Sequence, residues 1–323
     1  MVTGSAALCG DAAAQQATLG RITVTDSLAA AVAEVDSIPY ERTFSGAEAM
    51  PNAPPGTLAT ARKEPKVMLH VDSVSKSFAG LKALQDVSLR VMEGQTVGLI
   101  GPNGSGKSTL FDIISGFQRA NAGAVTFQGS PIHRQPPNGI ADLGLIRTFQ
   151  LSEGGQRMTA LENLLASAQN QVEANLLEAV LRLRRLLNVE RENLSRAKEV
   201  LKLLGLIHVA NEYVGNLSGG QRKLMDLGRI LMAKPKMSLL DEPTAGVNPS
   251  LINLIIDALK IMQHDEGITL LIVEHNMQVV SEICEQVYVL DAGVLIAQGS
   301  PEMIQSDERV LTSYLGGGRA VNE

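Results

Sequence analysis

Residues Gly101–Ser108 read GPNGSGKS, and they match the pattern G-x-x-x-x-G-K-[ST] at every position. The glycines let successive backbone N–H groups turn towards an anion, because no Cβ stands in the way. Lys107 can place a positive charge against the β- and γ-phosphates of a nucleotide, and the hydroxyl of Ser108 is suited to bind Mg²⁺. The pattern therefore predicts a phosphate-binding loop.

The sequence on either side of this loop supports the same interpretation. Thr96–Ile100 is a short apolar run that predicts a buried strand leading into the loop, and Ser108–Ile114 has the apolar spacing of a helix. This order places phosphates at the N-terminus of a helix, where backbone N–H groups can bind them. A glycine-rich turn that matches by chance is the alternative, and the context disfavours it.

The composition limits the classes of protein to consider. The chain has 323 residues, 45% of them hydrophobic, enough for one large domain or two small ones. A net charge of −6 argues against a general nucleic-acid binder, which is usually basic. Cys9 and Cys284 predict no disulfide framework and fit a reducing compartment. No apolar run is long enough to span a membrane, and the N-terminus does not resemble a secretory signal.

Residues 1–66 differ in composition from the rest of the chain. They are rich in Ala, Ser, Thr and Pro, and the segment Met50–Gly56 is typical of a linker. We expect a mostly disordered extension, with a short helix at Leu28–Val35 and a linker that continues to Lys66. A tail that binds a partner is the alternative.

The segments around the phosphate-binding loop predict an antiparallel β region. Its strands are expected at Met68–Val71 and Ala83–Val91, before the loop, and Ala124–Phe127 predicts another short strand that a turn closes. A mainly helical stretch is expected from about Ala160 to Val209, where apolar residues recur at helical spacing. Its basic residues are interpreted as a solvated helix face rather than a lipid or nucleic-acid site.

The last third of the chain predicts a largely parallel sheet. Buried strands are expected at Met237–Leu240, Ile268–Val273 and Gln286–Leu290. Val294–Ala297 then predicts an edge hairpin, and Arg309–Leu315 a final helix.

Two carboxylates follow the first of these strands. Asp241 stands where a strand end beside the phosphate-binding loop would hold Mg²⁺. Glu242 points elsewhere because it is one residue further on, and it could polarise the attacking water. Acids that merely solvate a turn are the alternative, and the upstream loop favours the functional interpretation.

Leu217–Gln221 reads LSGGQ and precedes an amphipathic helix. Ser218 can cap that helix, and Gly219 and Gly220 can present N–H groups to an anion. One nucleotide cannot reach two such distant sites in one small fold. We therefore expect a dimer, in which this segment covers the nucleotide of the other subunit. A plain helix N-cap is the alternative.

These motifs occur in an order that identifies a family. The phosphate-binding loop, LSGGQ, Leu239–Pro243 (LLDEP) and Val273–Asn276 (VEHN) resemble those of the ATP-binding subunit of an ABC transporter. The resemblance covers about Val67–Gly316. It implies an α/β fold with a P-loop NTPase core and a mainly parallel sheet, an antiparallel β subdomain, and an α-helical subdomain at about residues 151–216. Residues 1–66 remain as an extension and 317–323 as a tail.

The resemblance also implies the roles of individual residues. Phe78 matches the aromatic residue that stacks on adenine, Gln150 the glutamine that senses Mg²⁺ and the attacking water, and His275 the histidine that contacts the γ-phosphate. The catalytic set is then Lys107, Gln150, Glu242 and His275, and the metal set Ser108, Gln150 and Asp241. The residues expected to bind ATP are Phe78, Gly101, Pro102, Asn103, Gly104, Ser105, Gly106, Lys107, Ser108, Thr109, Ser218, Gly219, Gly220 and Gln221.

Several segments resemble the importers of branched-chain amino acids in particular. They are Gly144–Gln150, Ala160–Leu165, Ala245–Pro249, Gly299–Glu302 and Tyr314–Gly316. Asn248 stands where an Asp is usual, which bears on how this loop communicates between sites. The resemblance implies two permease subunits, a second and different ATPase, an extracytoplasmic solute-binding protein, no nucleic acid, and a place on the cytoplasmic face of the membrane.

Other functions remain open from the sequence. Urea and short-amide importers share the same signatures. The Arg147–Gln150 segment disfavours an exporter or lipid-extraction ATPase. The span between the motifs is too short for the long coiled coil of a soluble DNA-repair ATPase. The single phosphate-binding loop disfavours a translation ATPase, which carries two cassettes in one chain. A non-hydrolysing scaffold is disfavoured because Glu242, Gln150 and His275 are all present.

Overall fold

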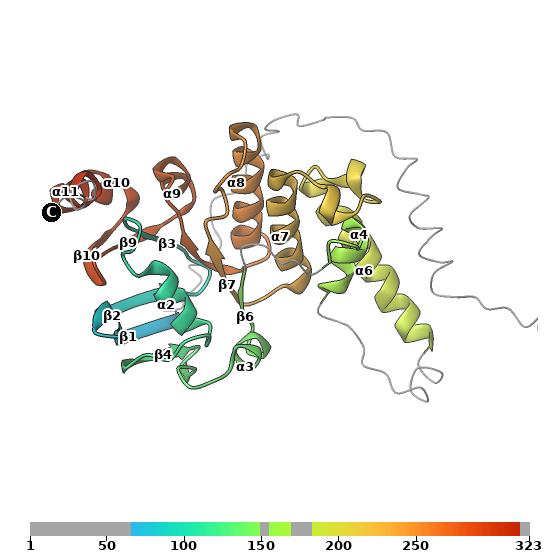
Figure 1. The fold of residues 1–323 in the computed structure, drawn as a ribbon. Helices are drawn as coiled ribbons and strands as arrows, with labels where there is room; N and C mark the ends of the chain where they lie inside the picture. Colours follow the sequence, from blue (N-terminus) through green and yellow to red (C-terminus); the bar gives the residue numbers. More distant parts are fainter. Residues whose placement is uncertain (1–65, 149–154, 169–182, 317–323) are drawn as a thin grey trace, which may run out of the picture. The chain divides into compact units, whose positions relative to one another are not determined.

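The computed structural model describes residues 66–148, 155–168 and 183–316 (Figure 1), with the backbone alone at 183–187 and 314–316. Apart from Lys66, the predicted N-terminal extension, its short helix and its linker lie outside these residues. So do the predicted tail and Gln150.

The larger sheet has six strands in the order β10-β9-β3-β8-β7-β6. They are β3 (Thr96–Ile100), β6 (Leu145–Arg147), β7 (Met237–Asp241), β8 (Thr269–Val273), β9 (Gln286–Asp291) and β10 (Val294–Gly299). All neighbours are parallel except β10, which pairs antiparallel with β9 at the edge. Every residue of β3 and β8 is buried, as expected for strands that are covered on both faces of a sheet.

The smaller sheet is antiparallel and has the order β2-β1-β4-β5. Its strands are β1 (Val67–Phe78), β2 (Leu81–Met92), β4 (Ala122–Phe127) and β5 (Ser130–Pro131). Strand β2 alternates buried and exposed residues over much of its length, so one face packs on the core and the other faces solvent.

Helix α2 (Lys107–Ile114) lies between the two sheets (Figure 1). Leu110, Phe111 and Ile114 on this helix are fully buried. They belong to one hydrophobic cluster with residues of both sheets, including Leu69 and Leu99. This core therefore fixes the start of α2, where the phosphate-binding loop ends, against both sheets. Helices α8 (Pro249–His264) and α9 (Met277–Ile283) cover the opposite face of the larger sheet.

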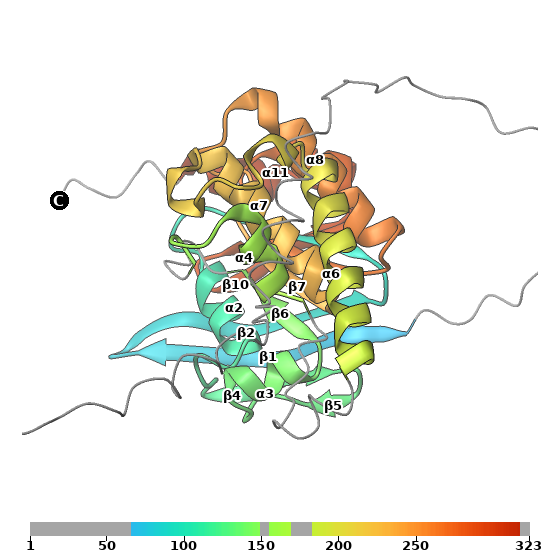
Figure 2. The same ribbon diagram turned by 90° about the vertical axis from the view of Figure 1, so that its right-hand side faces the viewer.

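A group of helices packs at one side of the larger sheet (Figure 2). It comprises α4 (Ala160–Ala166), α6 (Leu183–Leu203) and α7 (Gly219–Ala233), which contact one another, and α7 also contacts α8. Capping boxes begin two of these helices, at Thr159 before α4 and at Ser218 before α7. The remaining elements are α3 (Pro137–Asp142), η1 (Ile207–Val209), η2 (Val214–Asn216), α10 (Pro301–Gln305) and α11 (Glu308–Gly316).

The structure confirms the predicted fold class. The strand expected at Thr96–Ile100 has these bounds, and the hairpin expected after Asp291 is formed by β9 and the edge strand β10. In the mainly helical stretch expected from about Ala160 to Val209, the structure has α4 up to Ala166 and α6 from Leu183, and residues 169–182 lie outside the described part of the chain. Sequence reasoning did not anticipate β6 as a strand. Within the described ranges, no helix combines the length and apolar character needed to cross a bilayer.

Candidate functional site

The candidate site lies at one edge of the larger sheet. Strands β3, β6, β7 and β8 are parallel, so their carboxyl ends meet at the same edge. The residues that follow these ends are the phosphate-binding loop, Thr148, Glu242 and the segment Glu274–His275. Ligands of open α/β sheets bind outside the carboxyl ends of such strands.

The phosphate-binding loop requires glycine at two of its positions. Gly101 has φ 150°, and a Cβ there would lie 1.9 Å from the carbonyl oxygen of Leu290. Gly106 has φ 106°, and a Cβ there would lie 2.6 Å from the carbonyl oxygen of Ala83. Gly106 is also the N-cap of α2. The loop thus packs against backbone on both sides and enters α2 through a left-handed residue.

Lys107 is buried at the first turn of α2, and its ammonium group is held by the loop itself. Its Nζ donates hydrogen bonds to the carbonyl oxygens of Gly101 at 2.8 Å and Pro102 at 2.9 Å. Burial lowers the pKa of Lys107, and the negative charges of Glu242 and Asp241 partly offset that shift. The structure therefore brings the lysine and the two carboxylates into one electrostatic environment.

Two hydroxyl groups of the loop differ in their surroundings. Ser108 is exposed at the first turn of α2. The Oγ of Ser105 is buried and has no hydrogen-bond partner within the described part of the chain. A buried polar atom without a partner is unusual, and such an atom often binds a ligand, ion or water.

Asp241 is held by two residues at the end of β6. The guanidinium of Arg147 lies 3.3 Å from Oδ2 of Asp241 and 2.6 Å from Oδ1 of Asp112 on α2. The backbone N–H of Asp241 donates to the hydroxyl of Thr148 at 3.3 Å. Arg147 thus connects the helix of the phosphate-binding loop with the carboxylate at the end of β7. From the sequence, Arg147 was noted only as part of a segment that resembles one subfamily, and its contacts in the site were not predicted.

Glu242 adopts an unusual backbone conformation next to His275. Its φ is 47°, in the left-handed region that few residues with a side chain adopt. Its N–H donates to the carbonyl oxygen of Val273 at 2.9 Å. Its Oε1 lies 2.9 Å from Nε2 of His275. The structure therefore brings together the two side chains that the sequence assigned to hydrolysis.

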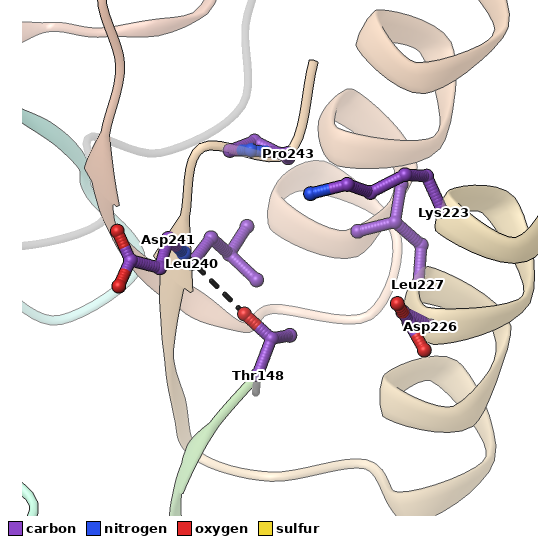
Figure 3. Close-up of a pocket in the computed structure, with 7 residues that line it drawn as sticks. All are labelled: Thr148, Lys223, Asp226, Leu227, Leu240, Asp241 and Pro243. Carbon is purple, nitrogen blue, oxygen red and sulfur yellow. Dashed lines mark hydrogen bonds between the residues drawn. The ribbon is translucent and has the colours of Figure 1, made fainter. Parts of the chain in front are cut away.

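Lys223 connects α7 to the same backbone (Figure 3). Its Nζ donates to the carbonyl oxygen of Glu242 at 2.9 Å. Figure 3 shows its side chain reaching from α7 towards the backbone at Pro243, while Asp241 points away from α7 on the other side of β7. A cavity of about 20 Å³, large enough for about one water molecule, lies between Thr148, α7 and the end of β7. No sequence motif singled out Lys223.

The LSGGQ segment forms the N-cap of α7. The Oγ of Ser218 accepts from the N–H of Gln221 at 3.3 Å, and Oε1 of Gln221 accepts from the N–H of Ser218 at 2.9 Å. Gly219 is exposed, whereas Gly220 is buried, and a Cβ on Gly220 would lie 2.6 Å from Cδ1 of Leu251. The capping described as the alternative is thus present, and it leaves an exposed helix N-terminus.

The remaining predicted residues lie as follows. Phe78 ends β1 with 42% of its surface exposed, and Nζ of Lys76 lies 4.9 Å from the centre of its ring. Asn248, the departure from the usual Asp, caps α8 by accepting from the N–H of Ser250 at 3.1 Å. Gln150 lies outside the described residues.

The comparisons with known proteins agree with this geometry. The model of the family described as "ABC transporter" matches residues 84–245, which include the phosphate-binding loop, LSGGQ and Glu242. A probable branched-chain amino acid transport ATP-binding protein LivG of Archaeoglobus fulgidus is 39% identical over 249 residues, which are 77% of this chain and 95% of that protein. The chain belongs to the ABC transporter ATP-binding family. It is therefore an ATPase that binds ATP and couples its hydrolysis to transport.

Further matches are to ATP-binding cassettes of branched-chain amino acid transporters and to a solved cassette structure. Residues 294–320 match the model described as "Branched-chain amino acid ATP-binding cassette transporter". A high-affinity branched-chain amino acid transport ATP-binding protein LivG of Salmonella typhimurium is 33% identical over 77% of this chain and 98% of its own length. The solved structure of the ADP conformation of MJ1267, an ATP-binding cassette of an ABC transporter, has 36% identity and a TM-score of 0.65, covering 77% of this chain and 99% of that one.

Proposed function

We propose that this ABC ATPase powers the uptake of branched-chain, hydrophobic amino acids through separate permease subunits. The observation that supports this cargo most directly is the match of residues 294–320, which lie outside the ATPase motifs, to the branched-chain cassette model. The names of the relatives from Archaeoglobus and Salmonella point to the same cargo.

The residues at the carboxyl ends of β3, β7 and β8 have different roles in hydrolysis. The loop N–H groups and Lys107 bind the phosphates of ATP, and Phe78 stacks on adenine. Glu242 orients the water for in-line attack, and His275 braces the γ-phosphate. The 2.9 Å contact between Glu242 and His275 supports this division, because one group fixes the position of the other. Gln150 keeps its proposed role as a sensor, although it lies outside the described residues.

The site also suits Mg²⁺. Ser108 presents an exposed hydroxyl at the start of α2, and Asp241 a carboxylate at the end of β7. These are hard oxygen donors of the kind that Mg²⁺ prefers, together with phosphate oxygens and water. The orphaned hydroxyl of Ser105 fits a loop built around a bound ligand. When bound, the ion neutralises charge on the β- and γ-phosphates.

A second cassette completes each site in this proposal. The exposed start of α7, with Ser218 and Gly219, covers the nucleotide held by the opposite subunit. The partner cassette is a different chain, and the two permeases contact the helical subdomain at about residues 151–216. The ATPase then lies on the cytoplasmic face of the membrane, and an extracytoplasmic protein delivers the solute. Residues 67–316 form the cassette, preceded by the extension 1–66.

Purification of the chain with its membrane complex tests the transport assignment. Mass spectrometry should identify two permeases and a second cassette, and ATP hydrolysis should rise with a binding protein loaded with leucine-like amino acids. Stimulation by urea or amides instead would support the ATPase assignment but would show that the transported solute is different. Recovery with ribosomes or nucleic acid, and no membrane partner, would overturn the assignment.

The variant Glu242→Gln tests the chemistry in the same complex. We expect steady-state hydrolysis to fall by a factor of at least about 100, because the amide cannot act as a base or hold water as a carboxylate does. Unchanged hydrolysis would remove the role assigned to Glu242.

A further inference from the structure

A buried carboxylate lies between the two strand ends that carry Glu242 and His275. Glu274 follows β8 directly and is only 3% exposed. Its Oε1 accepts hydrogen bonds from the N–H of Thr244 at 2.9 Å and from the hydroxyl of the same residue at 2.5 Å. Its Oε2 accepts from the N–H groups of His275 at 3.0 Å and Asn276 at 3.3 Å. Four donors thus converge on one side chain.

The chemistry of these contacts requires a carboxylate. An ionised Glu only accepts hydrogen bonds and offers about four lone-pair positions, which matches the four donors. A buried charge is tolerated when it is hydrogen-bonded in this way, and such charge-assisted bonds are stronger than neutral ones. The amide of a glutamine would turn its NH₂ group towards two of the donors and leave at least one backbone N–H unpaired, because only the hydroxyl of Thr244 could turn to accept.

The donors belong to two loops, which also meet through the contact between Glu242 and His275. Thr244 lies two residues after Glu242 in the loop that follows β7, and His275 lies in the loop that follows β8. The strands are in parallel register, with Asp241 opposite Val273. Glu274 therefore fixes the backbone of one loop against the other just beyond the end of the sheet.

The conformation of Glu242 makes this restraint necessary. A left-handed backbone at a residue with a side chain is strained and persists only where the surroundings over-determine it. The N–H of Glu242 donates to Val273, and its carbonyl oxygen accepts from Lys223 and from the N–H of Ala245. Thr244 is held by Glu274, and loss of that contact weakens the restraint on the chain just after Glu242.

We propose that Glu274 is a positioning residue for ATP hydrolysis. By binding Thr244 on one side and the backbone of His275 on the other, it holds the side chains of Glu242 and His275 in their 2.9 Å contact. It acts through these residues, because its own oxygens are occupied by the four donors. The inference rests on the roles proposed above for Glu242 and His275.

The test uses the variants Glu274→Gln and Thr244→Val in the purified transporter complex. We expect each to lower kcat by a factor of at least about ten, because misplaced reacting groups slow chemistry strongly. KM and the Kd of a fluorescent ATP analogue should change by less than about threefold, because the phosphate-binding loop is not touched. Thr244→Ser keeps the hydroxyl donor and should restore most of the rate.

Controls separate this role from a purely structural one. Glu285→Gln makes the same exchange just before β9, at the other edge of the sheet, and should leave kcat unchanged. If Glu274→Gln lowers the melting temperature but keeps the wild-type kcat for each bound nucleotide, Glu274 is structural and the proposal is wrong. Glu242→Gln is measured in the same assay. If this variant hydrolyses ATP normally, the role proposed for the site itself is wrong. If Glu242→Gln is inactive but Glu274→Gln is fully active, only the inference about Glu274 is wrong.

Discussion

Oε1 of Glu242 lies 2.9 Å from Nε2 of His275, although the two residues are 33 positions apart in the sequence. The contact exists because β7 and β8 are parallel neighbours in the sheet, so the residues that follow them emerge side by side. Because the two side chains are in direct contact, the effects of substituting them should not be independent.

The variant His275→Ala should lower ATP hydrolysis about 100-fold, a typical loss when one stabilising donor is removed from an active site. Combined with Glu242→Gln, the loss should be far smaller than the product of the single losses, because the residues depend on each other. Steady-state hydrolysis by the complex measures both. His264→Ala, in the last turn of α8, should hydrolyse ATP normally. Independent, multiplicative losses would contradict the coupling.

Lys223 should control the position of Glu242 from α7. Its Nζ donates to the carbonyl oxygen of a residue in a strained conformation. Lys223→Met removes this donor, so we expect kcat to fall about tenfold with KM nearly constant. Lys223→Arg can still donate and should keep most of the rate. Lys260→Met removes an exposed lysine that pairs with Glu282 and serves as the control. A raised KM with normal kcat would indicate a role in binding instead.

The sequence predicted the parts of the site that depend on local pattern. Thr96–Ile100 and Gly101–Ser108 were recognised because the apolar run and the loop glycines are adjacent in the chain. The contacts of Lys223 and Glu274 could not be predicted in this way. The first depends on how α7 packs beside the end of β7, and the second on the register of β7 and β8; the residues that meet are 19 and 30 positions apart. A glutamate within VEHN gives no signal that its carboxylate is buried.

The contacts of Arg147 also could not be predicted from the sequence. The sequence marked it as part of a family signature, but its charge partners, Asp112 and Asp241, lie in other elements. Strand β6 is only three residues long and too short to give a periodic pattern, so the place where Arg147 enters the site was not predicted.

Arg147→Met should destabilise the fold, because it leaves two carboxylates without their cation. The side chain of Arg147 is 11% exposed, and Asp112 is more exposed than Asp241. Breaking a buried pair costs about 3–5 kcal/mol, and partial exposure reduces our expectation to about 2–3 kcal/mol of unfolding free energy. Urea unfolding measures this difference. Lys236→Met, at an exposed lysine bonded to Gln128, should change it by less than about 0.5 kcal/mol. An equally small effect of Arg147→Met would show that the network contributes little.

The pH dependence of stability should reveal the buried charge of Lys107. Burial lowers its pKa in the folded chain below the ordinary value of 10.5, so the unfolded chain binds more protons in the interval between the two values. Stability attributable to Lys107 therefore rises with pH across that interval. Urea unfolding of the wild type and Lys107→Met, from about pH 8 to about pH 10.5, isolates the contribution. The wild type should gain stability relative to the variant, and a flat or falling difference would contradict the burial argument.

Gly220→Ala separates the packing of LSGGQ from its role across the proposed dimer. The added Cβ would approach Cδ1 of Leu251, the end of a flexible side chain that can move, so we expect the unfolding free energy to change by less than about 1 kcal/mol. By contrast, Gly101→Ala would press a Cβ against the backbone oxygen of Leu290 and should cost more than about 3 kcal/mol.

Hydrolysis should respond to Gly220→Ala quite differently from stability. If the start of α7 covers the nucleotide of the opposite subunit, the added methyl group presses on Leu251 and displaces the N–H groups of this first turn from the phosphates. We expect the assembled complex to lose at least about tenfold in hydrolysis while each chain still binds ATP with unchanged Kd, since its own phosphate-binding loop is intact. Normal hydrolysis by this stable variant would mean that Gly220 serves only to pack α7 against α8, and that the partner's nucleotide lies elsewhere.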